Sequence, residues 1–249
     1  MAPAQSDFQP QPAPKATQAA QAAIGDGLVA EAQAFADKLA AWRHDLHQTP
    51  ELGNRLPQTS AYIQARLTEM GIPFATLVDG SCVVGLIGAG AAVAAQGNGT
   101  CTDDQAGTVI MLRGDMDALP VAEESGEPFA SVNGCMHACG HDMHATALLG
   151  AARLLKAREA ELVDANATVK LLFQPGEETF EGACAAIADG LLQNPRPQAA
   201  FAMHVNSQSP LGLVLYGSPA LSGVYGFRIT LQGKGGHGSS PEICIDPIT

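Results

Sequence analysis

Two patterns of apolar residues predict helices in the first part of the chain. Across residues 28–46, large apolar side chains recur at steps of three and four, which is the stripe of an amphipathic helix. Pro50 is expected to end this helix. A second helix is predicted over about 57–70, ending at Gly71, because glycine is a common residue just after a helix.

A different pattern predicts strands and a loop. Residues 74–87 contain two β-rich runs separated by Asp79-Gly80, and this predicts a hairpin. The stretch 88–107 is poor in large apolar residues and rich in Gly, Ala and Asn, so it is expected to be a surface loop inserted between strands. Residues 225–232 alternate apolar and polar with a period of two, which predicts a half-buried antiparallel strand.

The middle of the chain alternates apolar runs with helical patterns. The runs lie at 108–112, 169–173 and 199–203, and the helical patterns lie at about 144–158 and 182–193. Strands and helices of these lengths in alternation indicate parallel βαβ units. The predicted fold is therefore an α/β fold with a doubly wound, mixed but mostly parallel sheet flanked by helices.

Each of the three apolar runs ends in residues of acidic or metal-binding type. The first is followed by R-G-D-M-D, up to Asp117, the second by Q-P-G-E-E, up to Glu178, and the third by His204. In doubly wound sheets, ligands bind at the carboxyl ends of the strands. Three such clusters in register predict one site at this edge.

Residues 133–144, N-G-C-M-H-A-C-G-H-D-M-H, carry the densest cluster of ligand-type side chains. Cys139 and His141 lie two apart in a tight turn, so both can reach one transition-metal ion. His137 and His144 are nearby competitors. Asp142 either joins the site or caps the following helix. Packing thiols and capping groups are the alternative interpretation of the whole cluster.

The acidic pair Glu177 and Glu178 follows Pro175-Gly176. Neighbours in a regular strand face opposite sides, so both carboxylates reach one site only if the backbone turns there. One carboxylate would then ligate metal while the other takes a proton from water, as in hydrolytic metal catalysis. An exposed acidic pair is the alternative, and a nucleophilic pair of Cys139 with a histidine is another. No G-x-S-x-G elbow is present.

Two further histidines, His44 and His47, lie near the end of the first predicted helix. Either could reach the site, and a solvated or helix-capping role is the competing interpretation of both.

Composition narrows the class of protein. The net charge is −12, from 13 Lys and Arg against 25 Asp and Glu, which argues against nucleic acid and anionic membranes as partners. No apolar run has the length of a membrane span, and the N-terminus has no secretory signal. The six cysteines are scattered, which predicts free thiols and a cytoplasmic protein.

Three regions are predicted along the chain. Residues 1–26 are rich in Ala, Gln and Pro and are expected to form a disordered tail. Residues 27–220 are expected to form the metal-binding catalytic domain, with its boundary near 218–222. Residues 221–249 would begin a smaller α+β domain, in which a Gly-rich turn presents His237 without the spacing of a phosphate-binding loop.

Several of these motifs together resemble the M20 metallopeptidase family. They are R-G-D-M-D-A-L-P, H-A-C-G-H-D-M-H, F-Q-P-G-E-E, A-M-H-V and G-K-G-G-H-G-S-S-P with I-D-P-I, and they occur in the order of the family. They are most similar to its amidohydrolase branch of aminoacylase and hippurate hydrolase-like enzymes, which includes plant auxin-conjugate hydrolases. The opening W-R-H-D-L-H-Q-T-P-E-L-G also resembles that branch, and the resemblance covers about residues 28–249.

The resemblance implies hydrolysis of an N-acyl amino acid at a site with two divalent ions, for which Mn, Zn, Co and Ni are all suitable. Glu177 would be the general base, and Asp117 would orient a histidine ligand. Asp115 stands where other branches carry a ligating histidine. His237, in a lid domain that forms a homodimer, would reach the partner's site and stabilise the oxyanion. The implied metal ligands are Cys139, His141, Glu178 and His204.

Two departures from the family pattern qualify these expectations. No histidine follows His237, although the family carries a later ligand, so we expect the chain to be an N-terminal portion that is inactive or strongly impaired by itself. The stretch 88–107 is also longer than the branch leads us to expect. The alternatives are a dipeptidase or exopeptidase of the same family, which dipeptide assays would reveal, and a non-enzymatic or inactive metal-binding fragment or peptide-binding module.

Overall fold

The computed structural model describes residues 27–96, 101–216 and 227–248. The tail predicted at 1–26 and the domain boundary predicted near 218–222 lie outside these residues. The chain divides into two compact units between Val205 and Asn206, and each is described by itself. No helix among the described residues is long and apolar enough to cross a membrane.

The first unit alternates helices and strands much as the sequence pattern predicts. Residues 27–34 are helical and lead into the first named helix. The elements that follow are α2 (Ala36–His47), α3 (Pro57–Glu69), β1 (Phe74–Leu77), β2 (Cys82–Gly88), α4 (Ala89–Gln96), α5 (Asp103–Ala106), β3 (Thr108–Asp115), α6 (His141–Lys156), α7 (Glu159–Asp164), β4 (Ala167–Gln174), α8 (Gly182–Ala188) and β5 (Ala199–Ala202). The helix predicted over 182–193 thus ends earlier, and a turn at Gly190, with φ of +95°, follows it.

The five strands form one mixed sheet in the order β1-β2-β4-β3-β5. β1 and β2 form the predicted antiparallel hairpin, and β2 pairs antiparallel with β4. β3 runs parallel to both β4 and β5, with Asp115 opposite Gln174 at the end of the β3–β4 ladder. The centre of the sheet is therefore parallel, as predicted, and β3, β4 and β5 all end at the same edge.

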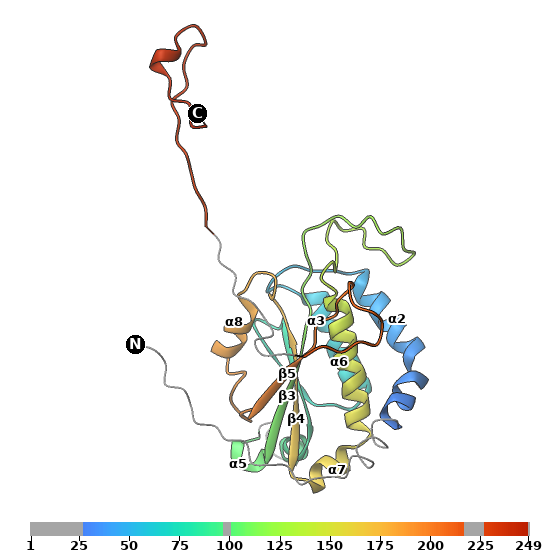
Figure 1. The fold of residues 1–249 in the computed structure, drawn as a ribbon. Helices are drawn as coiled ribbons and strands as arrows, with labels where there is room; N and C mark the ends of the chain where they lie inside the picture. Colours follow the sequence, from blue (N-terminus) through green and yellow to red (C-terminus); the bar gives the residue numbers. More distant parts are fainter. Residues whose placement is uncertain (1–26, 97–100, 217–226, 249) are drawn as a thin grey trace. The chain divides into compact units, whose positions relative to one another are not determined.

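Helices cover both faces of this sheet (Figure 1). On one face α2, α3 and α6 bury a large core, in which Trp42, Ile63 and Leu149 pack against Phe173 of β4. On the other face α8 and the turn after it pack against Leu172 of β4, in a smaller core. Alternate residues of β4 thus enter opposite cores, which is why this strand is buried on both faces rather than alternating between buried and exposed residues.

The prediction of a surface loop over residues 88–107 is wrong. The described part of this stretch forms α4 and α5, and its small side chains are buried, with Ala94, Cys101 and Ala106 packing on Val109 of β3. Small residues allow the backbone to approach closely, and Gly90 donates its N–H to Thr168 Oγ1 at 2.8 Å. The sequence did not reveal these helices because the prediction considered large apolar side chains only, whereas the buried residues here are mostly small.

The strand predicted over 225–232 is also not found in its described part. Residues 227–232 have no regular secondary structure, and Phe227, Ile229 and Leu231 are exposed. The described part of the second unit contains a short 3-10 helix, η1 (Pro241–Ile243), and a bridge between Lys234 and Ile245. An alternating pattern forms a strand only when a neighbouring strand pairs with it, and residues 227–232 have no such partner in the described structure.

Candidate metal centre

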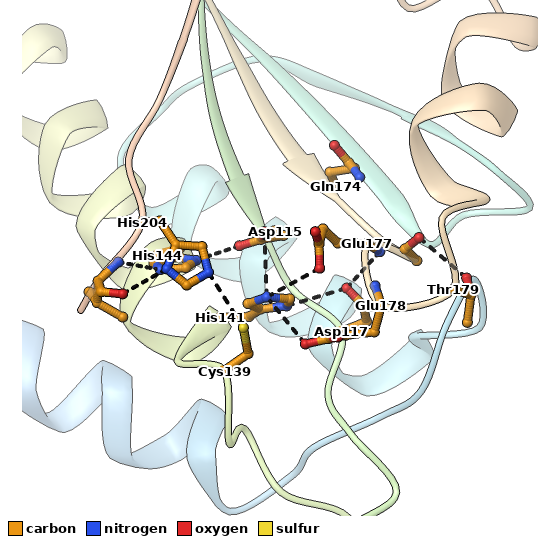
Figure 2. A network of polar contacts seen from close by, with 12 residues as sticks. Asp115, Asp117, Cys139, His141, His144, Gln174, Glu177, Glu178, Thr179 and His204 are labelled. Carbon is orange, nitrogen blue, oxygen red and sulfur yellow. Dashed lines mark hydrogen bonds and ion pairs between the residues drawn. The ribbon is translucent and has the colours of Figure 1, made fainter. Parts of the chain in front are cut away.

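The predicted site residues of the first unit gather where β3, β4 and β5 end, beside the start of α6 (Figure 2). β3 ends at Asp115, and Asp117 follows it by two residues. Both carboxylates are almost completely buried. Asp115 is paired with Arg113, whose Nη1 lies 2.8 Å from Asp115 Oδ2.

The turn after β4 brings the two adjacent glutamates to the same side. Gly176 has φ of +62°, and a Cβ at this position would lie 2.1 Å from Asn54 Oδ1, so only glycine fits. The backbone N–H groups of Glu177 and Glu178 donate to the two oxygens of Asp117, each at 3.0 Å. Because both amides bind one carboxylate, this turn is held rigidly against the end of β3.

Cys139 and His141 flank Gly140 at the start of α6. Gly140 has φ of +87°, and a Cβ there would lie 2.6 Å from Val205 Cγ2. Glycine therefore allows both the sharp entry into the helix and the close approach of the chain after β5. The turn orients Cys139 and His141 toward the same region, as the motif predicts.

His204 reaches this region from the end of β5. Its Nε2 lies 3.4 Å from Cys139 Sγ, and its Nδ1 lies 2.7 Å from the carbonyl oxygen of Val205. Cys139, His141 and His204 offer ligand atoms that all lie within 4.8 Å of one another. They come from segments 65 residues apart, which only the fold brings together.

His141 is the centre of the arrangement, and its ring is fully buried. Its Nδ1 lies 3.4 Å from Asp117 Oδ1, whereas its Nε2 lies 3.7 Å from a carboxylate oxygen of Glu177 and 3.7 Å from one of Glu178. Two further groups of metal-compatible atoms contain this ring, one with Glu177 and Glu178, the other with Asp115 and His144. His141 is thus shared by all three such groups among the described residues.

The site is strongly acidic. Burial by itself would lower the pKa of His141, but the Asp117 and Asp115 carboxylates outweigh it and raise that pKa. Burial and then the charge of Glu178 raise the pKa of the Cys139 thiol to about 12. Neighbouring carboxylates contribute to both shifts, and a bound cation would offset that contribution.

Buried polar atoms without a partner show that the site fits a metal ion. Both ring nitrogens of His141 and Oε1 of Glu178 are inaccessible and make no hydrogen bond within the described structure. Leaving such an atom unsatisfied costs about 1–3 kcal/mol. Imidazole, thiolate and carboxylate are the ligands that zinc and related divalent ions prefer, so a cation would satisfy these atoms.

The two competing histidines of the motif have other surroundings. His144 is buried, and its Nδ1 lies 2.6 Å from Asp115 Oδ1. Its Nε2 accepts a hydrogen bond from the N–H of Val205 at 2.9 Å. His137 is also buried, burial lowers its pKa to about 4, and it joins none of the metal-compatible groups among the described residues.

Asp142 does not cap α6, and His47 is not solvated, so both of those interpretations are wrong. The N-terminus of α6 has no side-chain cap. Asp142 Oδ2 instead accepts from Arg43 Nε at 2.7 Å and lies 2.8 Å from His47 Nδ1. His47 is buried, and its Nε2 lies 3.0 Å from Glu123 Oε1.

This second polar cluster, formed by Arg43, His47, Glu123 and Asp142, ties α2 and the loop before α6 to the start of α6. Sequence reasoning did not find it. The one available signal was the spacing of Arg43 and His47, four residues apart and hence on one face of a helix. His44, the other histidine of this helix, stacks on Phe129 with ring centroids 3.8 Å apart.

His237 belongs to the second unit. It lies in the predicted Gly-rich turn, and its Nδ1 is 2.8 Å from Ser239 Oγ. Because the two units are described separately, its role as an oxyanion stabiliser stays a prediction.

Comparison with known proteins shows which family the chain is similar to. Residues 111–219 match the model of peptidase family M20/M25/M40. IAA-amino acid hydrolase ILR1-like 4 of Arabidopsis thaliana is 40% identical over 216 residues, which are 86% of this chain and 44% of that protein. N-acetylcysteine deacetylase of Bacillus subtilis is 38% identical over 218 residues, which are 87% of this chain and 53% of that protein.

A solved structure is similar to this chain as well. A dinuclear metal-binding peptidase of the M20 family from Bacillus subtilis is 37% identical, with a TM-score of 0.61 over 72% of this chain and 46% of that one. The chain spans about half the length of the relatives it matches. The chain thus carries a match to the M20 peptidase family over residues 111–219, and the relatives to which it is similar support the amidohydrolase branch of that family.

Proposed function

We propose that the protein hydrolyses the amide bond of N-acyl amino acids at a centre of two divalent ions. The observation that carries this proposal is the position of His141. Its Nε2 faces the Glu177 and Glu178 carboxylates, and the same ring forms a metal-compatible group with Cys139 and His204. One buried imidazole thus joins a thiol and histidine group to a glutamate pair, as a two-ion centre requires.

The ligands of this centre would be Cys139, His141, Glu178 and His204. Asp117 supports this assignment for His141, since its carboxylate faces Nδ1 and leaves Nε2 directed at the site. The ions themselves stay unspecified among Mn, Zn, Co and Ni, because similar divalent ions are selected by geometry and availability.

Exposure separates the roles of the two glutamates. The Glu178 side chain is 21% exposed and has one buried oxygen without a hydrogen-bond partner, which suits a ligand. The Glu177 side chain is 36% exposed, which suits a base that must exchange its proton with solvent and product. Since Asp117 holds both backbone amides, the two carboxylates stay directed at the same space.

When bound, the ions would polarise the substrate carbonyl and lower the pKa of a water molecule. Glu177 would accept the proton of the attacking water and deliver it to the leaving amine. Asp117 would keep the turn and the His141 ring in place during both transfers. The products are a carboxylic acid and a free amino acid.

A thiol nucleophile at Cys139 has less support. Cys139 Sγ does lie 3.4 Å from His204 Nε2. However, burial and then the neighbouring carboxylates disfavour a free thiolate, which such a mechanism needs. A metal ion at the same sulfur removes this difficulty because it binds the thiolate form.

Metal binding can be tested on the 249-residue chain. The chain, stripped with a chelator and titrated with Zn²⁺ or Mn²⁺ in a calorimeter, should bind two ions. Cys139→Ala should abolish or strongly weaken the binding of one ion. Cys184→Ala, which removes an exposed cysteine on α8, should change the binding of neither ion. Unaltered metal content in Cys139→Ala would count against the proposed ligand set.

Turnover should be tested on the purified protein. N-acetyl and N-benzoyl amino acids should be hydrolysed in preference to dipeptides, and exhaustive chelation should abolish the reaction. Glu177→Gln should lower kcat by about 10²–10⁴-fold with metal content unchanged. Glu181→Gln, at an exposed acid four residues further on, is the matched control. Full activity after chelation would refute the mechanism.

An exopeptidase is the second candidate, because the solved relative from Bacillus subtilis is described as a peptidase. The same substrate panel decides between them, since faster cleavage of dipeptides than of N-acyl amino acids would favour the exopeptidase.

We also propose that His237 acts in a homodimer, where it would stabilise the oxyanion in the partner's site. This role and a cytoplasmic location stay predictions. Loss of kcat in His237→Ala, with metal content and the dimer retained in sedimentation, is the result expected for the first.

A further inference from the structure

His144 lies in the first turn of α6, beside the proposed ligands, and both of its ring nitrogens are already engaged. Nδ1 is 2.6 Å from Asp115 Oδ1, and Nε2 accepts the backbone N–H of Val205 at 2.9 Å. The side chain is only 1% exposed, so water does not compete for either nitrogen. Figure 2 labels His144 beside His204, with a dashed line from its ring to Asp115.

These partners determine which nitrogen carries the proton. A backbone N–H can only donate, so Nε2 of His144 must present its lone pair to Val205. The proton of the neutral ring then sits on Nδ1 and is donated to Asp115, a carboxylate that Arg113 also holds. With its Nε2 lone pair committed, His144 cannot bind a metal ion, although Asp115, His141 and His144 form a metal-compatible group.

The residue that His144 holds is directly next to a proposed ligand. β5 ends at Ala202, so His204 lies beyond the ladder of the sheet, in a segment without regular structure. The carbonyl of Val205 is 2.7 Å from His204 Nδ1, which leaves Nε2 facing Cys139. The amide of Val205 is therefore an anchor point, and the His144 ring also contacts the His204 ring, with centroids 4.5 Å apart.

We propose that His144 is a positioning residue that acts through Val205 to direct His204 at the ion held with Cys139 and His141. It rests on the two-ion centre proposed above, and it assigns to His144 a role other than ligation. Loss of the hydrogen bond to Val205 should lower the binding affinity for that one ion by about 10–100-fold, as is usual when a group that orients a ligand is removed. The ion held with Glu178 should be unaffected.

Two substitutions of similar size separate the two bonds of the ring. In His144→Gln, the side-chain carbonyl takes the place of Nε2 and can accept the N–H of Val205, but the bond to Asp115 is lost. In His144→Asn, the amide nitrogen takes the place of Nδ1 and can donate to Asp115, but the bond to Val205 is lost. A positioning role through Val205 therefore predicts that the two variants differ.

The experiment is a calorimetric titration of the metal-stripped chain with Zn²⁺. Wild type should bind two ions, His144→Gln should keep both affinities within about threefold, and His144→Asn should lose about 10–100-fold at one ion only. Equal losses in both variants, or no loss in His144→Asn, would overturn the inference while leaving the two-ion centre intact. Absence of tight binding to wild type would overturn the centre itself and this inference with it.

A second measurement does not depend on how the variants fold. In wild-type protein loaded with ¹¹³Cd²⁺ and labelled with ¹⁵N in its histidines, the nitrogens of His141 and His204 should couple to cadmium. The ring nitrogens of His144 should show no such coupling, and its Nδ1 should be the protonated one. Cadmium coupling at His144 would show that it is a ligand and would refute the positioning role.

Discussion

Replacing Asp117 by Asn tests the residue that joins the turn after β4 to the His141 ring. The two side chains have nearly the same shape, so the change removes charge and one acceptor without opening a cavity. Asp117 is fully buried, accepts two backbone N–H groups at 3.0 Å, and faces His141 Nδ1 at 3.4 Å.

The size of the effect follows from these contacts. A hydrogen bond to a charged acceptor contributes about 1.5–3 kcal/mol, and a buried donor left without a partner costs about 1–3 kcal/mol. In the Asn variant one amide keeps a neutral acceptor while the other faces an NH₂ group, so we expect a loss of about 2–4 kcal/mol. This is a large part of the roughly 5–15 kcal/mol by which domains are stable.

The assay is urea unfolding of the metal-stripped chain, followed by the fluorescence of Trp42, the single tryptophan, which is buried in the main core. The midpoint should fall with an unchanged slope, and Zn²⁺ affinity should fall by about 10–100-fold because the His141 ring is no longer oriented. Asp164→Asn, at an exposed position at the end of α7, should change neither quantity.

The reasoning would be refuted if Asp117→Asn unfolded at the same urea concentration as wild type and bound two ions with the same affinities. If the variant lost stability but kept its Zn²⁺ affinity, the role of Asp117 in holding the turn would be supported. Its role in orienting the His141 ring would be refuted.

Two other predictions concern groups outside the centre. Ser125, Ser131 and His47 bind the Glu123 carboxylate and, against the effect of burial, lower its pKa from 4.5 to about 2. The stabilising effect of the Glu123 carboxylate should therefore be complete above pH 4.5 and be lost as the pH falls toward about 2. The difference in unfolding free energy between wild type and Glu123→Gln should shrink over that range. A constant difference would contradict the role of the charge. Lys170 donates from its buried ammonium to three carbonyls in the turn before β5, and Lys170→Met should cost about 3 kcal/mol in urea unfolding because those carbonyls lose their donor. An unchanged midpoint would show that the turn finds other partners.

Much of the fold could be predicted because its periodicity is local. The stripe of α2, the hairpin of β1 and β2, and the apolar runs of β3 and β4 each follow from residues that lie within one element. The edge at which the site lies could also be predicted, since parallel strands of one sheet end together. The stretch 88–107 could not, because whether alanines are buried depends on what packs against them, here Val109 and Thr168.

The amino-acid sequence by itself determined which residue types can bind metal and that they follow three strands of a parallel sheet. Only the tertiary structure decided how the polar groups of the motif divide among roles. Asp142 binds Arg43 from 99 residues away, and His144 binds Val205 from 61 residues away, whereas His141 Nε2 makes no hydrogen bond within the described structure. The physical reason is that a ligand-type side chain is available to an ion only if no distant donor or acceptor has already taken its lone pair.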